Sequence, residues 1–157
     1  MRKRIVGPHH AKQGGQSDKG WLDLKQIATV EVTSEDPNRP IERAFGSNDG
    51  PGWRASEGGE QQIRIIFDKP VSIHRIELRF HEGDCERTQE FILRSSESGG
   101  SSTEIVRQQW NFSPTGSTTE IEHYVVDLDA VSVLELAIRP DLRRPEAVAS
   151  LASMRLG

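Results

Sequence analysis

The chain has 157 residues, a length that suits one folded domain. Hydrophobic residues make up 34% of it and charged residues 28%, which is a lean but globular composition. The formal net charge of −4 argues against general attraction to nucleic acids or anionic membranes, and no apolar run is long enough to span a bilayer. The basic start lacks the apolar segment of a signal peptide, and the single cysteine, Cys85, excludes an internal disulfide. We therefore expect a cytoplasmic protein, and its oligomeric state stays open.

The first third of the chain predicts a tail, a short helix and a strand. Residues 1–17 mix charge, glycine and glutamine without apolar periodicity, which predicts a flexible tail before a single domain over 18–157. Apolar residues spaced three apart predict a helix over about 21–28. The alternating β-branched run at 29–33 predicts the first strand, and the prolines of 34–40 end it.

The middle of the chain begins with a turn-rich loop over 44–56. Two alternating segments follow, 62–67 and 75–80, joined by Asp68-Lys69-Pro70, and each offers one apolar face to a core. Further alternating or apolar runs predict five more strands, over 87–96, 103–112, 119–128, 131–138 and 147–156. About eight antiparallel strands separated by turn signals predict an all-β sandwich.

Several motifs follow one another in a recognisable order. They are Ala44, Asp49-Gly50, Trp53-Arg54-Ala55-Ser56, Phe67-Asp68-Lys69-Pro70-Val71, Ile73-His74-Arg75-Ile76-Glu77-Leu78 and the closing segment 149–156. This order is similar to that of the discoidin or coagulation-factor C-domain superfamily. The resemblance covers about residues 29–156 and implies a galactose-binding-domain-like jelly roll, a fold shared by bacterial carbohydrate-binding modules.

The resemblance also raises the question of a metal. Many carbohydrate-binding members of the superfamily hold a structural calcium with the Asp-Gly loop, a Thr hydroxyl and a Glu of the last strand. Here Pro51-Gly52 stands in the place of the Thr, and Ser153 in the place of the Glu. Calcium takes about six to eight oxygen ligands, so Asp49 with backbone carbonyls predicts a weak site at most. We expect no cofactor, with Asp49 as the ligand if calcium binds.

Trp53 and Arg54 are the first candidates for ligand contact. An aromatic face stacks on a sugar ring, and a guanidinium offers a rigid fork of donors to hydroxyls or carboxylates. The competing interpretation places Trp53 in the core beneath the loop, with Arg54 as a structural clamp. We favour this core interpretation, because large apolar rings are mostly buried.

Trp110 is the second aromatic candidate. It lies two residues before Phe112 on a predicted strand, so both rings share one face, which is either core or a binding platform. The core interpretation is again the stronger one. In that case the two rings support a ligand-binding loop from below.

The connector at 81–86 concentrates residue types that bind metals, namely His81, Asp84, Cys85 and Glu86. Structural zinc needs four ligands from elements that enclose the ion, which a six-residue turn rarely provides. We therefore interpret the connector as a charged hairpin tip. With Arg87 beside it, the same connector can serve as a ligand-binding loop.

No pattern in the chain indicates catalysis. There is no Gly-x-Ser-x-Gly elbow and no glycine-rich phosphate loop, so we expect no enzyme.

We expect a non-catalytic binding module, whose ligand is a carbohydrate. The site would lie in loops at one end of the sandwich, drawn from Asp49, Trp53, Arg54, His81, Asp84, Arg87 and Trp110. The alternative is a cytoplasmic protein–protein interaction module that uses the same loops or a sheet face. Neither nucleic acid nor membrane is an expected partner.

Overall fold

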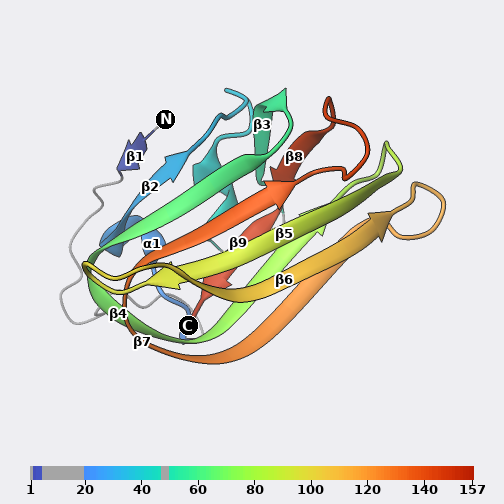
Figure 1. Cartoon of the computed structure of the whole chain (residues 1–157). Coiled ribbons are helices and arrows are strands. Elements are labelled where there is room, and N and C mark those ends of the chain that lie inside the picture. Colours follow the sequence, from blue (N-terminus) through green and yellow to red (C-terminus); the bar gives the residue numbers. More distant parts are fainter. Residues whose placement is uncertain (1, 5–19, 47–49) are drawn as a thin grey trace.

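Apolar and polar residues alternate along most of the chain, and this pattern appears as strands (Figure 1). The computed structural model describes residues 2–4, 20–46 and 50–157. The elements in these ranges are β1 (Arg2–Arg4), α1 (Leu24–Ile27), β2 (Ala28–Val32), the 3-10 helix η3 (Ile41–Ala44), β3 (Trp53–Gly58), β4 (Gln61–His81), β5 (Arg87–Ser96), β6 (Thr103–Phe112), β7 (Thr119–Arg139), β8 (Val148–Leu151) and β9 (Ser153–Leu156). The predicted all-β sandwich is confirmed.

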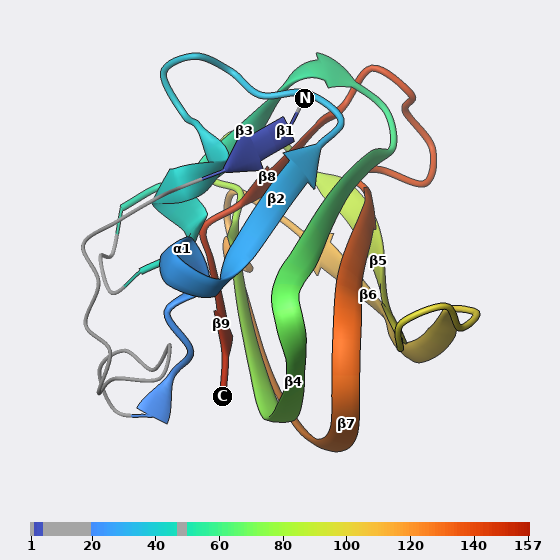
Figure 2. The same cartoon turned by 90° about the vertical axis from the view of Figure 1, so that its left-hand side faces the viewer.

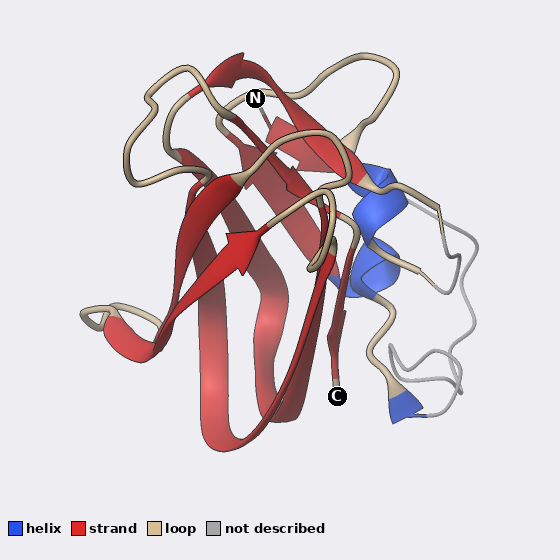
Figure 3. Cartoon of the chain, turned by 90° about the vertical axis from the view of Figure 1, so that its right-hand side faces the viewer, coloured by secondary structure: helices blue, strands red, loops and turns tan. Residues whose placement is uncertain are grey.

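Two strands of 21 residues each, β4 and β7, form the frame of the sandwich. They pair antiparallel from Gln61 opposite Ile138 to His81 opposite Thr119. Figure 3 shows both strands bent into a U, so that each contributes to both layers. The first half of β4 pairs with β2 and the second half with β9. Because of the bend, both ends of β4 and both ends of β7 lie at one end of the molecule.

The bend corrects one prediction. The sequence predicts a turn at Asp68-Lys69-Pro70 between two separate strands, and a break between 128 and 131. The structure instead keeps both regions within single strands, with register shifts between Ile66 and Arg75. Opposite them, Ala130 adopts a φ of 54°. Bulges take up the extra residues and bend a strand sharply without ending it.

The remaining strands complete the two layers (Figure 2). The larger sheet has the order β1-β2-β4-β7-β5-β6, with β9 also on β4, and β3 pairs with β8. The hairpin of β5 and β6 has the predicted bounds. The helix is shorter than predicted, β3 replaces part of the predicted loop, and the last predicted strand divides into β8 and β9. Arg2–Arg4 form β1, and the rest of the predicted tail lies outside the described residues.

Trp53 is the largest side chain in the core. Its exposed fraction is 0%, and it opens β3, which lies against β8. The indole Nε1 donates a hydrogen bond of 3.1 Å to the carbonyl of Ser34 at the end of β2. The core interpretation of Trp53 is confirmed, and its candidacy as a ligand contact is wrong, because no face of the ring is left for a sugar.

Within the described part of the chain, no helix has the length and apolar character needed to cross a membrane.

Trp53→Ala is expected to lower the free energy of unfolding by about 3–5 kcal/mol, the usual loss for a large buried ring. The substitution opens a cavity and leaves the Ser34 carbonyl without its indole donor. Urea denaturation measures the loss. Ile121→Ala, at a side chain that is 54% exposed, is the control and should change stability by less than about 0.5 kcal/mol. A Trp53→Ala protein as stable as the control would contradict the role given to this ring.

Candidate functional site

Three connectors meet where the arms of β4 and β7 end, and we call this region the loop end. The connectors are 82–86, 113–118 and 140–147. The Glu82 amide donates to the Thr118 carbonyl at 2.8 Å, and the Leu142 amide donates to the Thr88 carbonyl at 2.9 Å. Segments far apart in the sequence are therefore tied together by backbone hydrogen bonds.

Arg87 is the buried centre of the loop end, with an exposed fraction of 3%. Its Nε donates to Glu82 Oε1 at 2.8 Å, and its Nη1 donates to Gln89 Oε1 at 3.0 Å and to the Pro140 carbonyl at 2.8 Å. The guanidinium also lies over the Phe112 ring, 4.7 Å from its centroid. Arg87 is thus a structural clamp, and its prediction as a ligand contact is wrong because the ionised head does not reach the surface.

Glu82 is the carboxylate partner of Arg87, and its hydrogen bonds keep it ionised. Burial alone would raise the pKa of Glu82, but the hydrogen bond from Arg87 and the amides of Asp84 and Cys85 outweigh burial and lower it. The carboxylate therefore stays ionised, pairs with Arg87 and fixes the turn that follows it. The turn at 83–86 is held from inside.

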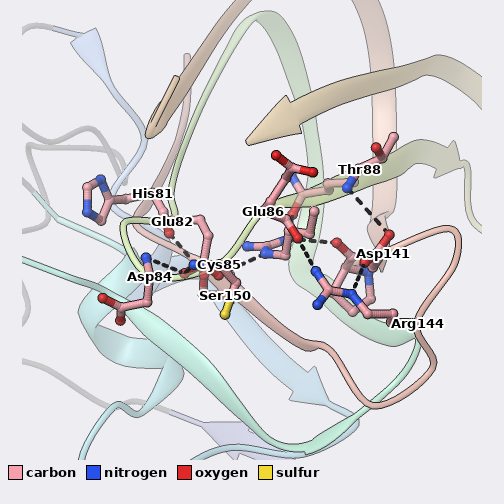
Figure 4. Close-up of polar contacts among 12 residues, drawn as sticks. His81, Glu82, Asp84, Cys85, Glu86, Thr88, Asp141, Arg144 and Ser150 are labelled. Atoms are coloured by element: carbon pink, nitrogen blue, oxygen red, sulfur yellow. Dashed lines mark hydrogen bonds and ion pairs between the residues drawn. The ribbon is translucent and has the colours of Figure 1, made fainter. Parts of the chain in front are cut away.

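A second carboxylate, Asp141, holds the other side of the loop end (Figure 4). It accepts a hydrogen bond of 2.9 Å from Arg144 Nε and one of 3.4 Å from the Thr88 amide. Burial would raise the pKa of Asp141, but these bonds and the Arg143 amide lower it instead. Arg144 also donates to the Glu86 carbonyl, so the connector at 140–147 is joined to the one at 82–86.

His81 and Asp84 are the predicted residues that remain on the surface. Both are exposed, and in Figure 4 they lie on the opposite side of the connector from Arg144. His81 Nδ1 lies 3.3 Å from the Thr119 hydroxyl, and the His81 carbonyl accepts a bond of 3.5 Å from Ser150 Oγ. The two side chains thus stand on a backbone that Glu82 and Arg87 fix in place.

Trp110 takes an intermediate position. The ring is half-buried and packs against the core, so the core interpretation holds for part of it. With Gln109 and Asn111 it lines a shallow depression of about 340 Å³. Asn111 Oδ1 accepts a 2.8 Å hydrogen bond from the Thr88 hydroxyl, which connects this depression to the loop end.

The predicted calcium ligand, Asp49, lies outside the described residues, so the weak calcium site stays a prediction. The carbonyls near it are described. Arg39 donates from Nε to the Gly52 carbonyl at 3.2 Å and from Nη2 to the Pro51 carbonyl at 2.6 Å. A guanidinium therefore braces the segment that follows Asp49, and no group of three or more His, Cys, Asp or Glu suited to a metal occurs in the described ranges.

Glu120 is a carboxylate buried inside the sandwich. It is fully buried on β7 and accepts a 3.2 Å bond from Gln89 Nε2, on the strand that carries Arg87. Burial, followed by the hydrogen bond and the charge of Glu122, raises the pKa of Glu120 to about 8. The group is therefore protonated at neutral pH. Sequence reasoning missed Glu82, Glu120, Asp141 and Arg39, because only their burial and partners distinguish them from the other charged residues of the chain.

Comparison with solved structures identifies the architecture. The family 32 carbohydrate-binding module of Clostridium perfringens NanJ, solved with galactose, matches with a TM-score of 0.61 and 14% identity over 82% of this chain and 92% of that one. A pectin-binding module matches with a TM-score of 0.59 and 17% identity over 84% and 91% of the two chains. The fold is a discoidin-like jelly roll. The family 32 module of AlyQ, solved with 4,5-unsaturated mannuronic acid, shares this jelly roll with a TM-score of 0.56 and 16% identity over 100% and 98% of the chains. No family model and no curated protein matches the sequence.

Arg87→Met should lower the free energy of unfolding by about 3–5 kcal/mol, because it leaves the Glu82 carboxylate buried without its partner. The double variant Arg87→Met/Glu82→Gln should recover part of this loss, since it has neither the arginine nor the unpaired carboxylate. Arg107→Met, which removes a half-exposed guanidinium paired with Glu104 and Glu90, is the control. It should cost about 1 kcal/mol or less, because Arg139 and Gln109 remain beside Glu90. Equal losses for Arg87→Met and Arg107→Met in urea denaturation would mean that Arg87 is not a clamp.

The raised pKa of Glu120 predicts that the free energy of unfolding falls as the pH rises. Its pKa is about 8 in the folded protein against a usual 4.5, so between these values the folded state keeps a proton that the unfolded state has lost. The free energy of unfolding should therefore decrease from about pH 4.5 through pH 8. Glu120→Gln should flatten this slope in thermal or urea unfolding across pH 5–9, while Glu104→Gln, an exposed control on β6, should leave it unchanged. An unchanged slope in Glu120→Gln would refute the assignment.

Proposed function

We propose that this chain is a non-catalytic carbohydrate-binding module with its site at the loop end. The contacts would come from His81 and Asp84 on the connector after β4 and from Arg54 on β3. Arg54 lies opposite Ser150 in the ladder of β3 and β8, and Ser150 bonds to the His81 carbonyl, so the backbone of Arg54 lies near that of His81. A cytoplasmic location stays a prediction.

One observation carries this proposal: the loop end presents exposed polar side chains on a backbone that a buried ion pair holds in place. Sugar hydroxyls are recognised by a few precisely placed polar groups, and binding is tighter when these groups are ordered before the ligand arrives. The Arg87–Glu82 pair supplies this order beneath His81 and Asp84. The modules of the same fold that were solved with galactose or an unsaturated mannuronic acid support a sugar as ligand.

A glycan array tests the proposal. The purified protein is applied once with calcium and once with a chelator. Reproducible binding is expected, and the variants His81→Ala and Asp84→Asn should each weaken it about tenfold, the usual effect of losing one good hydrogen bond to a ligand. Both positions are exposed, so folding should be unaffected. Thr103→Ala, an exposed position at the far end of β6, is the control. A blank array in both conditions would refute the proposal, and binding that is lost only with the chelator would show that it depends on a metal ion, which Asp49→Asn would then assign or not assign to Asp49.

A specific surface favours the alternative, a protein–protein interaction module. Val125 is 94% exposed and Ile121 54% exposed, and they lie on the same outer face of β7. Exposed apolar residues on one face of a sheet are a common feature of protein contacts. A blank array would therefore lead to a pull-down with the wild type and with Val125→Ser/Ile121→Ser. A partner retained by the first and lost by the second would support this function.

A further inference from the structure

Three arginines gather beside the loop end, and we call them the arginine cluster: Arg39, Arg43 and Arg54. The Arg54 amide donates to the Arg39 carbonyl at 3.2 Å, which places the two residues next to each other on different segments. Arg43 follows in η3, one turn after Arg39, and is exposed. The sequence does not place these residues together, because the segment 44–52 separates Arg54 from the other two.

The charges of the cluster act on one another. The pKa of Arg39 lies below its usual value, first because of burial and then because of the positive charges of Arg54 and Arg43, while Asp36 and Glu82 oppose this shift. Arg54 and Arg43 thus repel the positive charge of Arg39. An anion that bound among them would relieve this repulsion.

Two carboxylates near Arg39, Asp36 and Glu82, accept hydrogen bonds from other groups. Asp36 Oδ1 accepts the Asn38 amide at 2.9 Å within a turn, and Glu82 forms the buried pair with Arg87. The side chains of Arg43 and Arg54 make no hydrogen bond or ion pair with any residue that the structure describes. The cluster therefore has donors and positive charge that its described neighbours do not use.

Arg39 is held in a fixed orientation. Its Nε and Nη2 donate to the carbonyls of Gly52 and Pro51. A guanidinium has five N–H donors, so others remain for a ligand. A planar, preorganised guanidinium suits a carboxylate especially well, because two parallel N–H···O bonds can form.

The cluster also adjoins the proposed sugar site. Arg54 lies opposite Ser150, whose hydroxyl bonds to the His81 carbonyl. The charge of Glu82, in the connector that carries Asp84, acts on Arg39. One bound saccharide could therefore meet His81 with its hydroxyls and the arginine cluster with an acidic group.

The geometry points to an acidic sugar as the ligand, with the carboxylate of a uronic acid bound by Arg39, Arg43 and Arg54. This inference rests on the proposed function and deepens it. The net charge of −4 disfavours dense polyanions such as nucleic acids, which would meet repulsion from the rest of the surface. A short oligosaccharide with one carboxylate per ring meets the arginines locally.

Matched trisaccharides test the inference by isothermal titration calorimetry. The probes are α-1,4-linked trigalacturonic acid and α-1,4-linked galactotriose, which differ only in the group at C6, together with trimannuronic acid and mannotriose. Wild-type protein should bind at least one acid about tenfold or more tightly than its neutral partner. Arg43→Gln should abolish most of this preference and leave neutral binding unchanged, whereas Arg54→Gln, at a contact of the proposed sugar site, should weaken the binding of both acid and neutral sugars. Added salt should weaken the acid selectively.

Arg107→Gln is the control, because it removes one positive charge from an exposed site on β6. It should leave the preference for the acid intact. An equal loss in Arg107→Gln would indicate general charge attraction and overturn the inference. Binding of neutral sugars as tight as that of the acids would also overturn it, while the proposed function would stand. Absence of binding both here and on the glycan array would refute the proposed function itself.

Discussion

The buried guanidinium of Arg87 is the contact on which the loop end depends. An ionised group out of water must be paired and hydrogen-bonded, or the fold loses several kcal/mol. Arg87 largely meets this requirement with its Nε and Nη1, which reach Glu82 in the connector after β4, Gln89 on its own strand and Pro140 at the end of β7. Its Nη2 is buried without a partner among the described residues. The need to satisfy one charge therefore sets the relative positions of three segments. The exposed side chains of His81 and Asp84 lie on the connector that these contacts hold in place.

The second constraint is the continuity of β4 and β7. Their bends carry the chain from one layer to the other and bring four strand ends to the same end of the molecule. The hairpin of β5 and β6 could be predicted with its bounds, because local alternation and the Gly99-Gly100 turn define it. The bends could not, since Asp68-Lys69-Pro70 looks the same in a turn that reverses the chain and in a bulge. Only the partners β2 and β9, distant in sequence, distinguish the two.

The candidate site was predictable to a similar degree. The sequence places His81 and Asp84 in a polar connector, and the structure leaves both exposed there. It offers Trp53 as a ligand contact but favours the core for this ring, and it predicts Arg87 as a ligand contact; both are buried. A large apolar ring is mostly buried, so the residue type of Trp53 indicates its location, whereas a guanidinium is found both inside and outside proteins. The burial of Arg87 depends on the whole fold, since its partner Pro140 follows β7, far along the chain.

Arg87 and Arg39 both brace a loop, but their counter-charges lie in different places. Both donate to backbone carbonyls and both brace a loop. The charge of Arg87 is neutralised by Glu82 within the core, so its hydrogen bonds serve the fold alone. Arg39 is half-buried, has Arg54 and Arg43 as its positive neighbours, and keeps donors beyond those that hold Pro51 and Gly52. The position of the counter-charge therefore separates an arginine that only braces the fold from one that is open to a ligand. For Arg87 that charge is Glu82, inside the protein, whereas the side chains of Arg43 and Arg54 pair with no described residue, and under our proposal the carboxylate of an acidic sugar supplies theirs.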